Sequence, residues 1–303
     1  MVFLTKKKQK WTIQRNKTLQ GVLVGGDISK NAAADYFYRT ALQNELVKFI
    51  ESCYKDIKSV YSVIRIENAT PKRKPSPASV RIILNKYKGE KLQLFLKNSE
   101  KIIKKWLKMA SKSTDKSIKK ILSEMAGKQI SIDYDKSYDE ALKLMVQRNV
   151  QLIRNCTDQT LTNIENIVFD SMTTGEGWAG IEQTMKTQTH IGKDRIKRIA
   201  RDQTAKTNQA LNELAQREAG IKYFMWRTAQ DERVSTGYGG HKQLNNKIYR
   251  WGDFDNYPII DSYGHRGLPA QRVNCRCIAR PVWILNGYEA KQLSDGSYEI
   301  VKA

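Results

Sequence analysis

The chain has 303 residues, of which 40% are hydrophobic and 28% are charged, and its formal net charge at pH 7 is +22. This length allows two domains or one large domain with a packed core. The sequence lacks both a run of 18 apolar residues and the apolar centre of a secretory signal, so neither a membrane span nor a signal peptide is predicted. Four cysteines are too few for a disulfide scaffold and favour synthesis in a reducing cytoplasm.

The positive charge is concentrated in the first half of the chain. Residues 1–130 carry 29 Lys and Arg against 10 Asp and Glu, a net +19, whereas residues 131–303 carry 24 against 21, a net +3. A basic half of this kind indicates a polyanionic partner, and nucleic acid is the common one. The alternative is a solvated, lysine-rich helical surface.

The first half reads as helical after an irregular start. The lysines and glycines of residues 1–30 predict a basic irregular arm. Apolar residues at helical spacing predict a helix over 31–65. Three prolines predict a basic loop over 69–79. One or two further helices are expected over 80–126, with a break within 112–121.

The second half predicts helices followed by short strands. A long helix is expected over 136–170 and a short one over 176–187. The clearest helix runs from Asp194 to Ala219, with Gly220 as its stop. Aromatic and β-branched residues then predict three strands, at 221–228, 249–251 and 277–285. The fold class is therefore α+β: a mostly helical N-terminal region, then a small α+β C-terminal domain with a short sheet and long loops.

The clearest helix carries a polar face. Arg201, Thr204 and Asn208 recur at spacings of three and four residues and so share one side. This face is either solvated or holds the loops that follow it by hydrogen bonds.

The residues with the most versatile chemistry lie in the last third. Cys275 and Cys277 form a Cys-x-Cys pair whose thiolates could bind one zinc ion. His241 is the first candidate for a third ligand, and His265 or Asp231 for a fourth. Two alternatives remain: two small buried residues that pin a loop, or a nucleophile–base pair of Cys275 and His241. The other cysteines, Cys53 and Cys156, lie in helical patterns and are predicted to be packed thiols.

The order of motifs from residue 170 to 283 resembles the Mu F-like phage head morphogenesis family. Its most specific parts are ARDQT with a following Asn, EAGI, WRT, DERV and VNCRC. The resemblance assigns structural roles to twelve residues: Arg201, Asp202, Thr204, Asn208, Trp226, Asp231, Arg233, His241, Asn274, Cys275, Arg276 and Cys277. Some members carry Cys-x-x-Cys after the Asp-Glu-Arg turn; this chain has VSTGYGGH there, so any zinc site would have mixed His and Cys ligands.

The resemblance implies a minor head protein of a tailed bacteriophage, located in the virion near the portal and made in the host cytoplasm. It would assist head assembly, DNA packaging or DNA ejection, without catalysis. The implied partners are the portal protein, the major capsid protein and double-stranded DNA bound non-specifically. The alternative is a non-specific nucleic-acid-binding protein that shares the domain. Together, the residue patterns and the resemblance predict a basic irregular arm at 1–30, a basic helical region at 31–135, the Mu F-like domain at 136–285 and a C-terminal tail at 286–303.

Overall fold

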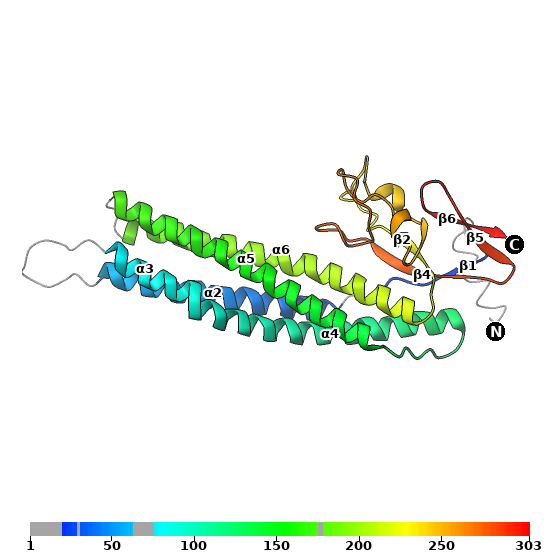
Figure 1. The fold of residues 1–303 in the computed structure, drawn as a ribbon, viewed down its shortest axis with the longest axis horizontal. Coiled ribbons are helices and arrows are strands. Elements are labelled where there is room, and N and C mark those ends of the chain that lie inside the picture. The colour runs from blue at the N-terminus through cyan, green and yellow to red at the C-terminus, as the bar shows by residue number, and fades with distance from the viewer. Residues whose placement is uncertain (1–19, 29–30, 63–75, 175–177) are drawn as a thin grey trace, which may run out of the picture. The chain divides into compact units, whose positions relative to one another are not determined.

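A computed structural model describes residues 20–28, 31–62, 76–174 and 178–303. The chain divides into two compact units, which we call the helical unit and the sheet unit. The helical unit comprises Ala33–Leu107 and Leu142–Arg201, and the sheet unit comprises Met1–Ala32, Lys108–Ala141 and Asp202–Ala303. Figure 1 labels their elements. This combination confirms the predicted α+β class, with a helical N-terminal region and a C-terminal sheet.

Long helices account for most of the first 218 residues. Their bounds are α2 (Ala32–Ser62), α3 (Pro77–Lys86), a π-helical turn (Tyr87–Lys91), α4 (Leu92–Ala126), α5 (Lys136–Thr174) and α6 (Trp178–Glu218). Pro77 lies in the first turn of α3, where its missing N–H costs no hydrogen bond. The rest of the predicted proline-rich loop, residues 69–75, lies outside the described residues.

Aromatic packing and buried thiols mark the core of the helical unit. The Tyr38 ring stacks on Trp106 with centroids 4.1 Å apart, and its hydroxyl donates a 2.6 Å hydrogen bond to Oδ1 of Asn149. Cys53 and Cys156 are both buried free thiols, as predicted.

Two predicted helix interruptions were wrong. The structure has no break within 112–121, because Thr114, Ile118 and Leu122 continue the buried side of α4 at four-residue spacing. The short helix predicted at 176–187 and the helix predicted from Asp194 are one continuous helix, α6. Its interior Gly192 lies against helix α2, where a Cβ atom would come 3.1 Å from the Leu46 side chain.

The sheet unit contains one six-stranded antiparallel sheet in the order β1-β4-β2-β3-β6-β5. The strands are β1 (Val22–Val24), β2 (Tyr223–Arg227), β3 (Ile248–Arg250), β4 (Ile278–Ile284), β5 (Tyr288–Gln292) and β6 (Tyr298–Lys302). Strands β2, β3 and β4 match the three predicted ones. Strand β1 lies in the expected N-terminal arm, and β5 and β6 lie in the expected C-terminal tail.

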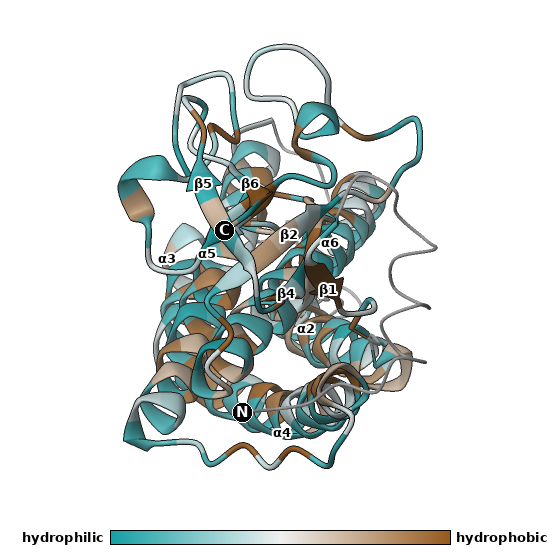
Figure 2. Cartoon of the chain, turned by 90° about the vertical axis from the view of Figure 1, so that its right-hand side faces the viewer, coloured by the Kyte–Doolittle hydropathy of each residue, from teal (hydrophilic) through white to brown (hydrophobic). Residues whose placement is uncertain are grey.

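The sheet buries side chains on both faces. On β2, Phe224 and Trp226 point into a core formed with the long loops, whereas Met225 points to the opposite face and packs against Val22 and Val282. A third cluster joins Leu23 to the buried sides of α4 and α6. Strand β1, which carries Leu23, is dark brown in Figure 2. These contacts hold the C-terminal part of α6 against the sheet, where the candidate site is built.

Candidate functional site

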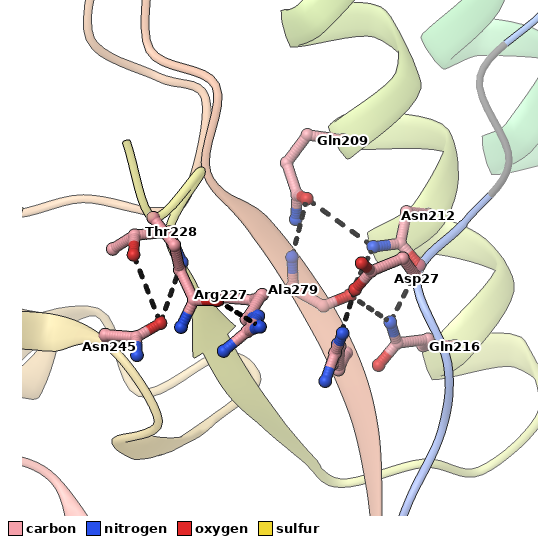
Figure 3. A network of polar contacts seen from close by, with 10 residues as sticks. Asp27, Gln209, Asn212, Gln216, Arg227, Thr228, Asn245 and Ala279 are labelled. Atoms are coloured by element: carbon pink, nitrogen blue, oxygen red, sulfur yellow. Dashed lines mark hydrogen bonds and ion pairs between the residues drawn. The ribbon is translucent and has the colours of Figure 1, made fainter. Parts of the chain in front are cut away.

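Three amide side chains of α6 bind the backbone of β4 (Figure 3). Asn212 Nδ2 donates to the Ala279 carbonyl at 2.7 Å, and Gln216 Nε2 donates to it at 3.2 Å. The Ala279 N–H donates to Gln209 Oε1 at 3.2 Å. All three amides are buried, at 6% exposure or less. We call Gln209, Asn212 and Gln216 the amide clamp.

The amide clamp forms the hydrogen bonds to Ala279 of β4 that a neighbouring strand would otherwise form. Strand β1 pairs with β4 only from Val282 to Ile284, with flanking backbone hydrogen bonds from Gly25 to Pro281 and from Leu285 to Gly21. The N–H and C=O of Ala279 therefore point toward α6 without a strand partner. Buried backbone polar groups require partners, and the clamp supplies them. Trp251 extends the network by donating its indole N–H to Gln216 Oε1 at 3.2 Å.

Asp202 fixes the start of the Asn-Cys-Arg-Cys motif. Its Oδ1 accepts the backbone N–H of Asn274 at 2.9 Å, and its Oδ2 accepts Lys206 Nζ at 2.6 Å. Asn274 has a φ of 60°, a left-handed conformation that Asn tolerates better than most residues. The hydrogen bond holds the chain in this conformation directly before Cys275.

Asp231 anchors the other end of the motif. Its two carboxylate oxygens accept both terminal guanidinium nitrogens of Arg276, at 2.5 and 2.6 Å. The same carboxylate accepts the backbone N–H of Arg233 at 3.2 Å and so closes the turn. The hydrogen bonds from Arg276, followed by those from Arg233, hold the pKa of Asp231 well below its usual range despite an opposing desolvation effect. This bidentate pair orients Arg276 outward between the two cysteines.

His241, Cys275 and Cys277 meet in the interior of the sheet unit. His241 Nδ1 lies 3.3 Å from Cys275 Sγ and 3.4 Å from Cys277 Sγ. The three side chains are buried, at 4%, 8% and 4% exposure. His241 Nε2 faces the Ile260 carbonyl at 3.0 Å. A carbonyl only accepts hydrogen bonds, so Nε2 carries a proton and Nδ1 is left facing the sulfurs.

A close backbone approach positions His241. Gly239 has a φ of 66°, and a Cβ atom built on it would lie 2.1 Å from the Asp261 carbonyl oxygen. The glycine therefore allows the loop before His241 to touch the loop that carries Ile260. Trp226 closes the other side, with its ring 5.4 Å from the imidazole in an edge-on arrangement.

The cluster favours one thiolate at neutral pH. The hydrogen bond from Cys277, together with His241, lowers the pKa of Cys275 to about 4 against the effect of burial. The same hydrogen bond raises the pKa of Cys277, because burial disfavours a second thiolate. Burial opposes protonation of His241, but the Cys275 thiolate and the Ile260 carbonyl outweigh it and raise the pKa of the imidazole. The cluster thus supplies one soft, negatively charged ligand atom, the Cys275 sulfur.

The donor set fits three positions around a zinc ion. Zinc holds sulfur at about 2.3 Å and nitrogen at about 2.0 Å, which places adjacent ligand atoms about 3.5 Å apart in a tetrahedron. The nitrogen–sulfur distances here are close to that value, and all three atoms lie within 4.8 Å of one another. The Ile260 carbonyl orients the imidazole as an outer partner of a metal-bound histidine would.

The candidates for a fourth ligand lie outside the cluster. Among the described residues, the group of potential metal ligands contains only His241, Cys275 and Cys277. His265 is exposed, with Nδ1 2.8 Å from Asp261 Oδ2, and Asp231 is committed to Arg276. A cavity of about 30 Å³, room for about one water molecule, borders Cys277, Asn208 and Gln209.

The predicted polar face of the clearest helix divides in the structure. Thr204 is buried and Asn208 borders the small cavity, but Arg201 is exposed. Asp202, which was among the predicted residues, accepts the hydrogen bond from Asn274 at the start of the Asn-Cys-Arg-Cys motif. The sequence did not predict the amide clamp. Its spacing of three and four residues is visible in the sequence, but glutamine and asparagine at that spacing equally fit a solvated face. Only the position of β4 identifies them.

The part of the chain that contains this site matches a known protein family. Residues 162–280 match the family model described as Phage Mu protein F like protein, which confirms the resemblance. The match spans the clamp and the cluster. An uncharacterized protein of Haemophilus influenzae (strain ATCC 51907 / DSM 11121 / KW20 / Rd) is 30% identical over 143 residues. That alignment covers 47% of this chain and 30% of the relative's own length.

No solved structure matches the chain. Among the described residues, no helix is long and apolar enough to cross a membrane.

Proposed function

We propose that this chain, whose residues 162–280 form a Phage Mu protein F-like region, is a minor head protein of a bacteriophage. In this proposal it associates with the portal protein and the capsid interior and assists head assembly, DNA packaging or DNA ejection. The observation that carries it is the family match over the complete clamp and cluster. The high positive charge supports a place beside DNA.

The proposal is tested in particles of the phage that encodes the chain. Procapsids and virions would be purified by gradient centrifugation and probed with antibodies against the chain and the portal protein. The proposal expects the chain to co-sediment with both particles and to remain with the portal after mild dissociation of the shell. Recovery of the chain only from the free protein fraction of the lysate would contradict it.

We further propose that the cluster is a structural closure rather than a catalytic centre. Cys275 is 8% exposed, and its sulfur faces His241 and Cys277. A structural zinc ion held by His241, Cys275 and Cys277 would tie the loop before β4 to the loop after β2. The metal would supply cross-linking of these loops, which matters because they contain little regular structure.

The second candidate function is non-specific nucleic-acid binding by a protein that shares the domain. The net charge of +22 supports it. This candidate expects DNA affinity to fall log-linearly with salt concentration, without any association with head particles. The particle experiment above separates the two functions.

A further inference from the structure

The solvent-facing side of α4 carries a single row of lysines. They follow one another at three- or four-residue spacing and are all exposed: Lys97, Lys101, Lys105, Lys108, Lys112, Lys116 and Lys120. With 3.6 residues per turn, this spacing places them on one side of the helix. The opposite side is buried through residues such as Ile103, Trp106 and Ile118, so α4 is amphipathic (Figure 2). We call these seven residues the lysine row.

Within the described ranges, the carboxylates on α4 nearest to the lysine row pair with other residues. Glu100 pairs with Lys104 at 2.5 Å, and Asp115 pairs with Lys119 at 3.0 Å and also accepts the Tyr134 hydroxyl. Over the part of the chain that the structure describes, no lysine of the row has an ion pair within 4.0 Å. Lys105 Nζ lies 4.8 Å from the centre of the Phe37 ring, a contact that leaves its positive charge in place. The row is therefore a run of positive charge with no ion-pair partner among the described residues.

An ordinary solvated helix face does not account for this pattern. Solvated faces usually mix both signs, as in the pairs Lys86–Glu90 and Glu182–Lys186 at four-residue spacing. Like charges at that spacing repel and destabilise a helix. A bound polyanion would remove this repulsion, and water alone would not.

We infer that the lysine row of α4 binds the phosphate backbone of double-stranded DNA. Lys97 and Lys120, the ends of the row, are 23 positions apart along α4, or about 35 Å at 1.5 Å per residue. One turn of duplex DNA has about the same length. Lysine carries a compact ammonium charge and lacks the planar guanidinium with which arginine forms two hydrogen bonds to guanine. The proposed contact is therefore independent of base sequence. A uniform row of one sign matches a uniformly charged polymer better than the mixed charges of a protein surface.

This inference deepens the proposed function, because it rests on DNA as a partner and assigns the surface that meets it. The test replaces Lys108, Lys112, Lys116 and Lys120 by Gln in the full-length chain. A matched control replaces four exposed lysines scattered over two helices, α2 and α5, and the loop before β2, with the same loss of charge: Lys48, Lys55, Lys143 and Lys222. Gln has nearly the helix propensity of Lys, and circular dichroism would verify that both variants fold.

Binding to a mixed-sequence duplex of 30 base pairs would be measured by fluorescence anisotropy between 50 and 200 mM NaCl. For the row variant, we expect the dissociation constant at 100 mM NaCl to rise at least about tenfold. The slope of log K against log salt concentration should fall by about 0.9 for each DNA phosphate that the variant no longer neutralises. The control should stay within about threefold of the unmodified chain.

Equally weakened binding by the row variant and the control would overturn the inference, because net charge alone would then explain binding. Unchanged DNA binding by the row variant would also overturn it. If that variant instead failed to enter procapsids while its DNA binding stayed intact, the row would be a surface for an acidic protein. Incorporation of the unmodified chain into particles is measured separately, so failure of this inference leaves the proposed head function standing.

Discussion

The backbone N–H of Asn274 donates a 2.9 Å hydrogen bond to Oδ1 of Asp202, a residue 72 positions earlier in the chain. This contact joins the polar side of α6 to the motif that carries both clustered cysteines. It explains why ARDQT and VNCRC occur together in the sequence pattern. The acid supplies the acceptor that the left-handed turn at Asn274 requires.

Replacing Asp202 by Ala should destabilise the sheet unit by about 1 kcal/mol, since it removes a partly buried hydrogen bond to the backbone N–H of Asn274. Asp202→Asn retains a side-chain oxygen and should cost less. Urea unfolding would compare the variants, and hydrogen exchange in peptides covering residues 272–280 would locate the effect. Unchanged exchange in Asp202→Ala would show that the hydrogen bond does not hold the motif.

Gly239→Ala should destabilise the chain far more than Gly237→Ala. Both glycines have positive φ, which costs other residues about 1–2 kcal/mol. Only Gly239 also meets the Asp261 backbone, at 2.1 Å from a built Cβ, whereas nothing lies within 4 Å of a Cβ on Gly237. Thermal unfolding of the two variants measures the difference. Equal melting temperatures would mean that the two loops need not touch to position His241.

The Asp231–Arg276 pair should make stability depend on acid pH. The pKa of Asp231 is lowered in the folded chain, so its contribution is present above the unfolded value of about 3.9 and is lost as pH falls through the folded pKa. Asp231→Asn should therefore lower the melting temperature at pH 7, and its difference from the unmodified chain should shrink as the pH falls below about 3.9. Melting curves from pH 7 to pH 2.5 test this, with the exposed Asp255→Asn as control. A constant difference across that range would argue against the ion pair.

Protein purified without chelators should contain about one zinc ion per chain, the stoichiometry of a structural site. His241→Gln, Cys275→Ser and Cys277→Ser should each lose the metal, because each removes one ligand atom. Elemental analysis by mass spectrometry measures the zinc content, and a chelator should lower the melting temperature of the unmodified chain but not of the three ligand variants. Cys156→Ser, which removes a buried thiol of the helical unit, should keep its zinc. A folded, metal-free chain whose melting temperature ignores the chelator would contradict the zinc proposal.

Local patterns predicted the elements well where one periodicity extended over many residues. The apolar spacing of α2 and α5 and the aromatic run of β2 were read directly from the residues. Helix ends inside continuous helices were predicted poorly: the run at 112–121 suggested a break, yet the helix continues through buried Thr114 and Ile118. A pattern over a few residues does not report the free energy that a long helix gains by packing one whole side against its neighbours.

The sequence by itself determined the α+β class, the excess of charge in the first half and the identity of the cluster residues, because these depend on composition, spacing and motif order. Tertiary structure decided which of those residues meet. It placed Cys275 and Cys277 on His241 while leaving His265 and Asp231 with other partners. It also turned Gln209, Asn212 and Gln216 from an ordinary polar face into partners of β4. The physical reason is that a hydrogen bond or ligand set depends on distances across the fold, and spacing along the chain does not fix those distances.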